Sequence, residues 1–220
     1  MELKGLKALF LGDSITEGHG ASSQDKVWWR VMGDRAGMET VGYGVGGTRI
    51  ARQTQPSECA AWDEDFNARA ERMDRQADIV CVFGGTNDFG HGSAPIGTPS
   101  DTDVYTFYGA LNHLYTYLQT TYPDAFIFVM TPMHRCGEER LRIADYKPEM
   151  LPLRSYVDII REVAEKYSLP VLDLWAESGI NPNNPVMRER FMPDGLHPND
   201  AGYARLADVA EAFLRSHGRA

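Results

Sequence analysis

The chain has 220 residues, which is enough for one compact domain with a substantial core. Hydrophobic residues make up 43% of the chain and charged residues 24%, as in an ordinary globular protein. The formal net charge of -9 argues against nucleic acid or an anionic membrane surface as the main partner, because both attract basic patches.

The first residues lead directly into an apolar run, without the layout of a signal peptide, and no run approaches the length of a membrane span. The three cysteines, Cys59, Cys81 and Cys136, show no Cys-x-x-Cys spacing, and their odd number does not suit a disulfide framework. These features predict a cytoplasmic protein in a reducing environment.

Short apolar runs and amphipathic segments alternate along the chain. The first predicted strand begins at Ala8 and ends at Gly12, and the pattern then continues to the last residues. In chain order we expect a helix over 27–38, a strand over 39–45, a helix over 67–75, a strand over 79–83, a loop over 89–103, a helix over 104–122, a strand over 125–130, an irregular segment over 135–152, a helix over 153–167, a strand over 170–174, a loop over 177–193, and a last helix from Asn199 or Asp200 to about Leu214.

Alternation of strands and helices predicts an α/β fold with a five-stranded parallel sheet covered by helices on both faces. The sequence has no repeat, linker or low-complexity segment, so residues 1–220 are expected to form a single domain. Four of the five strands end in Gly, Asn, Ser, Thr or His. In an open parallel sheet these ends share one edge, where ligands bind, so we expect the functional site there.

The first strand ends in Gly12-Asp13-Ser14. Glycine allows a sharp turn, which would place Ser14 at the carboxyl edge of the sheet, where a nucleophile is useful. The alternative is that Asp13 or Ser14 only caps the following helix, and for this short motif alone that alternative is favoured.

A serine nucleophile needs a base and a group that orients the base. Of the six histidines, only His197 has a carboxylate three residues earlier, at Asp194, in a turn before a helix. The carboxylate would fix the tautomer of the imidazole and stabilise its protonated form. The alternative, at about even odds, is a turn-capping Asp194 and a surface histidine.

Acyl transfer also needs hydrogen-bond donors for the developing oxyanion. The candidates are the backbone N–H of Ser14, the backbone N–H of Gly47 and the side-chain amide of Asn87. Taken singly, the glycines around Gly47 also suit a flexible turn, and Asn87-Asp88 also suits an Asx turn.

These residues occur in four segments that together resemble the SGNH hydrolases, also called the GDSL esterase/lipase family. The segments span nearly the whole chain in the order of the family's blocks: Gly12-Asp13-Ser14-Ile15-Thr16, Gly44-Val45-Gly46-Gly47-Thr48, Gly84-Gly85-Thr86-Asn87-Asp88 and Asp194-Gly195-Leu196-His197-Pro198. The resemblance implies a flavodoxin-like three-layer α/β/α sandwich. It also implies Ser14 as nucleophile, His197 as general base and then acid, Asp194 as the orienting carboxylate, and an oxyanion hole of Ser14, Gly47 and Asn87.

One position departs from the family pattern. Many members have an asparagine where this chain has Gly42, and this difference leaves the choice of Gly47 over Gly46 or Gly44 open. The sequence contains no His-Glu-x-x-His pattern and no Cys/His cluster, so neither a metal nor another cofactor is expected.

The substrate pocket is expected to involve the loops 90–100 and 133–152, either of which could act as a lid. Asp13, His91 and His134 are the candidate pocket residues, and Arg135 and Tyr146 lie in the same loops. A polar pocket would suit a short acyl group on a sugar or another polar alcohol, although these residues suit solvated loops equally well. We therefore expect a small-molecule ester as substrate.

The sequence also suits other functions. A lysophospholipase or thioesterase is the nearest alternative, and a small-ligand-binding module of the same fold is another. Nucleotide binding rests only on Gly42-x-Gly44-x-x-Gly47, which no long helix clearly follows. The oligomeric state cannot be read from the sequence, since Trp28 and Trp29 suit either a core or an interface.

Overall fold

The computed structural model describes residues 2–139 and 151–217. Its five strands form one parallel sheet in the order β2-β1-β3-β4-β5. The strands are β1 (Lys7–Gly12), β2 (Glu39–Gly44), β3 (Ile79–Phe83), β4 (Phe126–Met130) and β5 (Val171–Leu172).

Helices connect the strands and follow the last one. The α-helices are α1 (Ser14–Glu17), α2 (Trp28–Ala36), α3 (Phe66–Ala70), α4 (Thr86–His91), α5 (Phe107–Thr121), α6 (Leu153–Lys166), α7 (Leu174–Glu177), α8 (Pro185–Phe191) and α9 (Asp200–His217). Two 3-10 helices, η1 (Gln24–Lys26) and η2 (Ala60–Asp63), lie in the loops.

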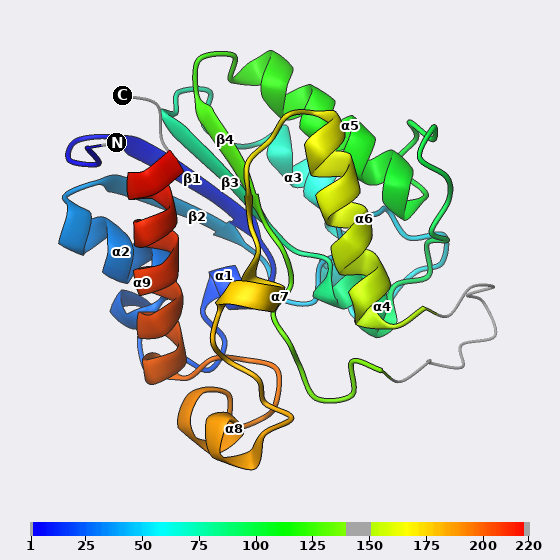
Figure 1. Ribbon diagram of the computed structural model, residues 1–220. Coiled ribbons are helices and arrows are strands. Elements are labelled where there is room, and N and C mark those ends of the chain that lie inside the picture. Colours follow the sequence, from blue (N-terminus) through cyan, green and yellow to red (C-terminus); the bar gives the residue numbers. More distant parts are fainter. Residues whose placement is uncertain (1, 140–150, 218–220) are drawn as a thin grey trace.

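The helices cover both faces of the sheet. Helices α2 and α9 lie together on one face, and α3, α5 and α6 lie on the other (Figure 1). This confirms the three-layer α/β/α arrangement expected from the sequence.

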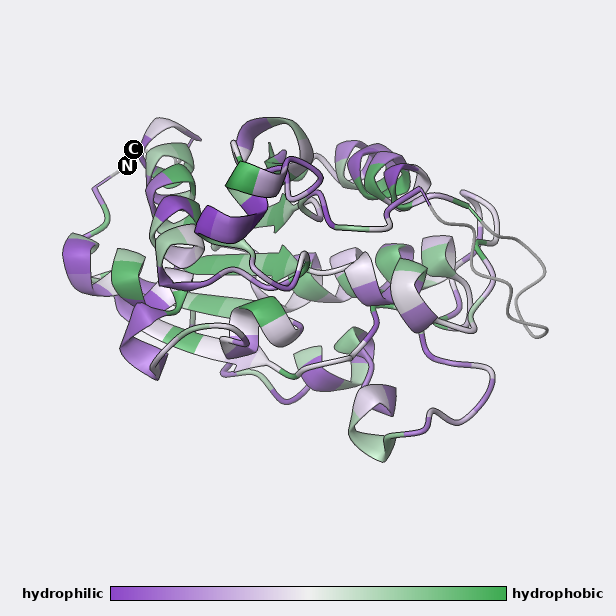
Figure 2. Ribbon diagram, turned by 90° about the horizontal axis from the view of Figure 1, so that it is seen from below, coloured by the Kyte–Doolittle hydropathy of each residue, from purple (hydrophilic) through white to green (hydrophobic). Residues whose placement is uncertain are grey.

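Two hydrophobic cores form because successive side chains of a strand point to opposite faces of the sheet. In β1, Leu9 and Leu11 belong to the core under α5 and α6, whereas Ala8 and Phe10 belong to the core under α2 and α9. Figure 2 shows the hydrophobic strands between the two helical layers. Strands β1, β3 and β4 are buried on both faces and have continuous apolar sequences, which is why short apolar runs predict them.

Four predicted segments differ from the structure. The expected strand over 170–174 is only β5, because α7 already begins at Leu174. The expected loop over 177–193 contains α8, whose Asn184 cap accepts the N–H groups of Val186 and Met187 and whose first residue is Pro185. The expected loop over 89–103 begins inside α4, which continues to His91. The expected helix over 67–75 is only α3, because the chain beyond it forms turns.

The aromatic pair Trp28 and Trp29 is buried in the core beneath α2 and α9, which decides between the two roles considered for these residues. Part of the loop after α4 is also packed inward, since Ala94 and Ile96 are buried and the Pro95 carbonyl accepts the N–H of Phe107. Among the residues that the structure describes, no helix has the length and hydropathy of a membrane span.

Candidate active site

A tight turn between β1 and α1 positions Ser14. A Cβ atom at Gly12 would lie 2.0 Å from the Oγ1 of Thr16, so any larger residue would collide with α1. Asp13 caps this helix, and its Oδ1 accepts the N–H of Ile15 at 3.0 Å. Because Asp13 provides the cap, the hydroxyl of Ser14 is available for another contact at the carboxyl edge of the sheet.

A turn before α9 holds Asp194 and His197 face to face. The Nδ1 of His197 lies 2.7 Å from the Oδ2 of Asp194. The Oδ1 of Asp194 accepts the backbone N–H groups of Leu196 and His197 at 2.8 and 2.7 Å. Partial burial opposes ionisation of Asp194, but these hydrogen bonds outweigh it and keep the pKa of the carboxyl below its ordinary value. The carboxylate favours the tautomer with the proton on Nδ1, which leaves Nε2 as an acceptor.

The imidazole of His197 reaches Ser14. The Oγ of Ser14 lies 3.0 Å from the Nε2 of His197, so the hydroxyl can donate to the ring. The segment that carries the histidine is held against the loop after α1: a Cβ atom at Gly20 would lie 2.4 Å from the carbonyl oxygen of Pro198. This close backbone approach fixes the distance between the two side chains.

The loop after β2 runs close beside α1. A Cβ atom at Gly44 would lie 2.2 Å from the backbone nitrogen of Glu17. The N–H of Gly46 donates to the Oε2 of Glu17 at 2.7 Å. At Gly47, φ is 75° and a Cβ atom would lie 2.2 Å from the ring of Trp62, so both backbone conformation and packing require glycine there. Since the N–H of Gly46 is already bonded, Gly47 is the better candidate for a donor to a substrate.

Packing explains the glycine at position 42. A Cβ atom at Gly42 would lie 2.4 Å from the Trp29 ring, so no asparagine side chain fits. The Nε1 of Trp29 donates to the carbonyl of Thr16 at 2.8 Å. The Trp29 ring therefore fills the space that a side chain at position 42 would need, and its hydrogen bond to Thr16 holds α1 in place.

Asn87 and Asp88 join α4 to the glycine loop (residues 44–48) and to the segment that follows it. The Nδ2 of Asn87 donates to the carbonyl of Thr48 at 3.0 Å. The two carboxylate oxygens of Asp88 accept the N–H groups of Ile50 and Ala51, each at 3.0 Å. These bonds are to residues distant in sequence, so the pair does more than form a local Asx turn.

The structure brings Ser14, Gly47, Asn87 and His197 together around one open cleft of about 390 Å³. His91, a candidate pocket residue, also lines this cleft. The other side chains on its walls are those of Glu17, His19, Val45, Ala61, Trp62, Arg135 and Leu196. Residues that follow β1, β2 and β3 thus meet at the predicted edge of the sheet.

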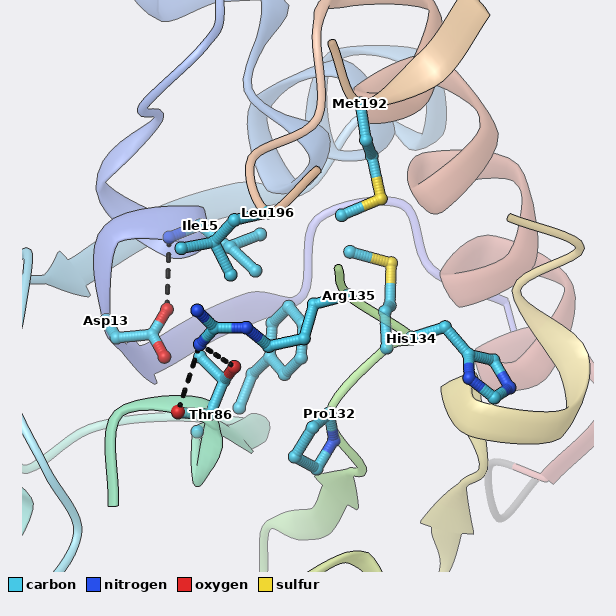
Figure 3. Close-up of a pocket in the computed structure, with 11 residues that line it drawn as sticks. Asp13, Ile15, Thr86, Pro132, His134, Arg135, Met192 and Leu196 are labelled. Carbon is cyan, nitrogen blue, oxygen red and sulfur yellow. Dashed lines mark hydrogen bonds between the residues drawn. The ribbon is translucent and has the colours of Figure 1, made fainter. Parts of the chain in front are cut away.

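Asp13 and His134 line a separate small cavity of about 10 Å³ (Figure 3). Such a volume holds one water molecule at most. Arg135 borders both this cavity and the open cleft, and its Nη1 donates to the carbonyl and the hydroxyl of Thr86 at 3.3 and 3.2 Å. The Nδ1 of His134 lies 2.9 Å from the Oε1 of Glu138.

Burial has the largest effect on the pKa values of Asp13 and Arg69. Asp13 is 2% exposed, and its burial raises the pKa of the carboxyl to about 6, although the N–H of Ile15 and the charge of Arg69 act in the opposite direction. Burial also lowers the pKa of Arg69 to about 10. Arg69 remains charged at neutral pH and donates to the Oγ1 of Thr48 at 2.8 Å, which supports the glycine loop.

The sequence does not indicate that Glu17, Ala61 or Trp62 lines the cleft, and it places Arg135 only in a loop near the site. The signal for Glu17 was its place one helical turn after Ser14, but the position of Trp62 depends on a long irregular loop. Tyr146, the other loop residue named from the sequence, lies outside the described residues.

Within residues 2–139 and 151–217, no group of three or more His, Cys, Asp or Glu side chains is arranged to hold a metal ion. The arrangement that is present, a hydroxyl beside an oriented imidazole, suits nucleophilic attack on an electrophilic carbon.

A family model and several solved structures match this chain. A family model described as the GDSL-like lipase/acylhydrolase family matches residues 10–205. Among curated proteins, none matches the chain. A crystal structure of a protein from Lactobacillus plantarum is 27% identical, with a TM-score of 0.83 over 99% of this chain and 100% of that one.

Two further solved structures share the fold at lower identity. The lipase/acylhydrolase from Enterococcus faecalis is 20% identical, with a TM-score of 0.65 over 96% of both chains. An acetyl xylan esterase, AlAXEase, is also 20% identical, with a TM-score of 0.63 over 95% of this chain and 100% of that one.

Proposed function

Because this chain belongs to the GDSL-like lipase/acylhydrolase family, we propose that it is a serine esterase whose nucleophile is Ser14. The observation that carries the proposal is the continuous line of contacts from Asp194 through His197 to Ser14, with separations of 2.7 and 3.0 Å. These are the contacts that a nucleophile, its base and an orienting carboxylate require. Residues 1–220 act as one catalytic domain in this proposal.

The first half of the reaction acylates the serine. The Oγ of Ser14 attacks the ester carbonyl carbon while the Nε2 of His197 takes the hydroxyl proton, and Asp194 stabilises the imidazolium that forms. The tetrahedral intermediate then collapses. His197 returns the proton to the departing alkoxide oxygen, the alcohol leaves, and the acyl group remains on Ser14.

The second half releases the acid. His197 removes a proton from water, and the resulting hydroxide attacks the acyl carbon. A second tetrahedral intermediate forms and collapses, and the proton moves from His197 to the Oγ of Ser14. The product is the carboxylic acid, and the free enzyme is restored.

Three donors stabilise the oxyanion in both halves: the N–H groups of Ser14 and Gly47 and the side-chain amide of Asn87. The bond from Gly46 to Glu17 supports Gly47, because it occupies the preceding N–H. The amide of Asn87 has two N–H groups, of which one donates to the carbonyl of Thr48. The second N–H is assigned to the substrate.

The substrate carries a short acyl chain on a polar or carbohydrate alcohol. The polar side chains of Glu17, His91 and Arg135 on the cleft walls suit a polar alcohol. The apolar side chains beside them, Val45, Trp62 and Leu196, suit a short acyl group. The fold shared with an acetyl xylan esterase is compatible with it.

Hydrolysis of p-nitrophenyl esters from acetate to palmitate tests the proposal. We expect the highest kcat/KM with acetate or butyrate and a steep fall with longer chains. A preference for long chains would instead favour a lysophospholipase or thioesterase. Absence of hydrolysis with every ester, including acetylated sugars, would favour a binding module.

A further inference from the structure

A second cavity of about 430 Å³ adjoins the cleft and shares Trp62 and His91 with it. The rings of these two residues lie 4.8 Å apart between their centroids and form the common wall. The rest of the second cavity is lined by Gln53, Gln55, Pro56, Ser57, Glu58 and Ser93. A substrate held at Ser14 can therefore extend past the two rings into this second space.

A buried arginine holds one wall of the second cavity. Arg49 is 1% exposed, and it donates to the Nδ1 of His91 at 2.9 Å, to the Oγ of Ser57, and to the Oδ1 of Asp63 at 2.9 Å. Asp63 is the neighbour of Trp62 in η2. One buried side chain thus holds His91, the loop at Ser57 and the residue next to Trp62, so the cavity is formed before any ligand arrives.

A further part of the cavity wall is held by hydrogen bonds between two loops. The Oε1 of Gln53 accepts the N–H of Ser93, and the Oγ of Ser93 accepts the N–H of Thr54 at 3.0 Å. The exposed side chains of Gln55 and Glu58 form no hydrogen bond with the described residues. They supply an amide and a carboxylate to the cavity.

The lining of the second cavity selects among ligand classes. Glu58 disfavours an anionic group, and the amides and hydroxyls disfavour a hydrocarbon chain. A sugar ring suits both features, because its C–H face packs on an aromatic ring while its hydroxyls bond to amide and carboxylate groups. The cavity volume lies in the range of small-molecule sites.

We propose that the cavity around Trp62, Gln55 and Glu58 is a subsite for a sugar ring that forms the alcohol part of the ester substrate. This inference rests on the proposed function, and it adds the position of the sugar and the residues that select it. Trp62 provides the stacking surface, and Gln55 and Glu58 bind hydroxyls.

Two acetate esters that differ only in the alcohol test the subsite: an acetylated methyl pyranoside and ethyl acetate. We expect Trp62→Ala to lower kcat/KM for the pyranoside about tenfold more than for ethyl acetate, mainly through KM, and Trp62→Phe to restore most of the loss. Equal losses with both esters would overturn the subsite, because Trp62 would then act only through its contact with Gly47.

Two variants at cavity residues that do not line the Ser14 cleft test the subsite independently of Trp62. Gln55→Ala and Glu58→Gln are each expected to lower kcat/KM for the pyranoside by about threefold to tenfold relative to ethyl acetate. Glu165→Gln, which removes an exposed carboxylate of α6, is the matched control and should not change that ratio. A ratio equal to that of the parent protein in both cavity variants would contradict the inference.

A direct binding measurement distinguishes failure of the sugar subsite from failure of the proposed esterase activity. Calorimetric titration of the Ser14→Ala variant with the acetylated pyranoside should give binding that an added Trp62→Ala change weakens about tenfold. If the parent protein hydrolyses neither ester but this binding is seen, the esterase proposal fails and the sugar subsite stands. Binding that is absent, or unaffected by Trp62→Ala, overturns the subsite.

Discussion

The Oγ of Ser14 and the Nε2 of His197 lie 3.0 Å apart although 183 positions of sequence separate the two residues. Ser14 follows β1, which lies between β2 and β3 in the sheet, and His197 lies just before the last helix. The parallel sheet brings the two together because α9 packs beside α2 on one face, and its first residue, Asp200, accepts hydrogen bonds from Ser22 in the loop after α1.

Asp194→Asn is expected to lower kcat by about 10³–10⁴-fold with little change in KM, because an amide no longer selects the imidazole tautomer that accepts the proton of Ser14. Hydrolysis of p-nitrophenyl acetate measures the effect. Asp208→Asn, which removes a carboxylate of α9 that pairs with Arg35, is the control and should retain activity. A loss of less than about tenfold in Asp194→Asn would argue against this carboxylate as the orienting group.

Asn87→Ala is expected to lower kcat by about 10²–10³-fold, since it removes one of three oxyanion donors. The variant also loses the bond to Thr48, so its thermal unfolding must be measured alongside. Asn112→Ala provides a matched control, because the amide of Asn112 is buried and donates to the carbonyls of Pro99 and Asp101, away from the cleft. We expect both variants to lose a similar amount of stability, but only Asn87→Ala to lose activity. Equal activities in the two variants would contradict this role of Asn87.

Glu17 fixes the glycine loop through its bond with Gly46, and we expect it to be a positioning residue for the N–H of Gly47. Glu17→Ala should lower kcat by about tenfold with little change in KM. Glu17→Gln keeps an acceptor oxygen and should recover most of that activity. Identical kinetics in the two variants would show that the accepted hydrogen bond is not what matters.

The pKa of Asp13 gives a stability prediction. Its pKa is raised from 3.8 in the unfolded chain to about 6 in the folded one, so between these values the folded state keeps a proton that the unfolded state has lost. The contribution of Asp13 to stability therefore falls as the pH rises through this window, by about 3 kcal/mol in total. Relative to the parent protein, Asp13→Asn should gain about that free energy of unfolding between pH 4 and pH 7.

Urea unfolding at pH 4, 5.5 and 7 measures this difference. Asp124→Asn, at an exposed carboxylate, is the control for the general effect of removing a negative charge. A difference between Asp13→Asn and the parent protein that stays constant with pH would show that Asp13 does not change its charge in this range.

The sequence predicts best what depends on short-range pattern. Strand β3 has the predicted bounds because its five residues are all apolar and all buried. The sequence predicts a loop where α8 forms, because Asn and Pro residues are typical of loops, although Asn184 followed by Pro185 is also a helix start. The resemblance to a known family identified the residues that the structure brings to one cleft.

Long-range contacts explain what the sequence could not predict. The choice of Gly47 over Gly46 depends on a bond between Gly46 and Glu17, which are 29 positions apart. The glycine at position 42 is explained only by the Trp29 ring packed against it. The wall formed by Trp62 and His91 depends on Arg49, a buried cation that no sequence pattern indicates.

The most direct test of Ser14 as the nucleophile is to compare the parent protein, Ser14→Ala and Ser155→Ala in the hydrolysis of p-nitrophenyl acetate. Ser155, on α6, lies away from the cleft and is the matched control. We expect Ser14→Ala to lower kcat by at least about 10³-fold with thermal unfolding little changed, whereas Ser155→Ala keeps the activity of the parent protein. If Ser14→Ala hydrolyses the ester at the rate of the parent protein, Ser14 is not the nucleophile and the proposed mechanism is wrong.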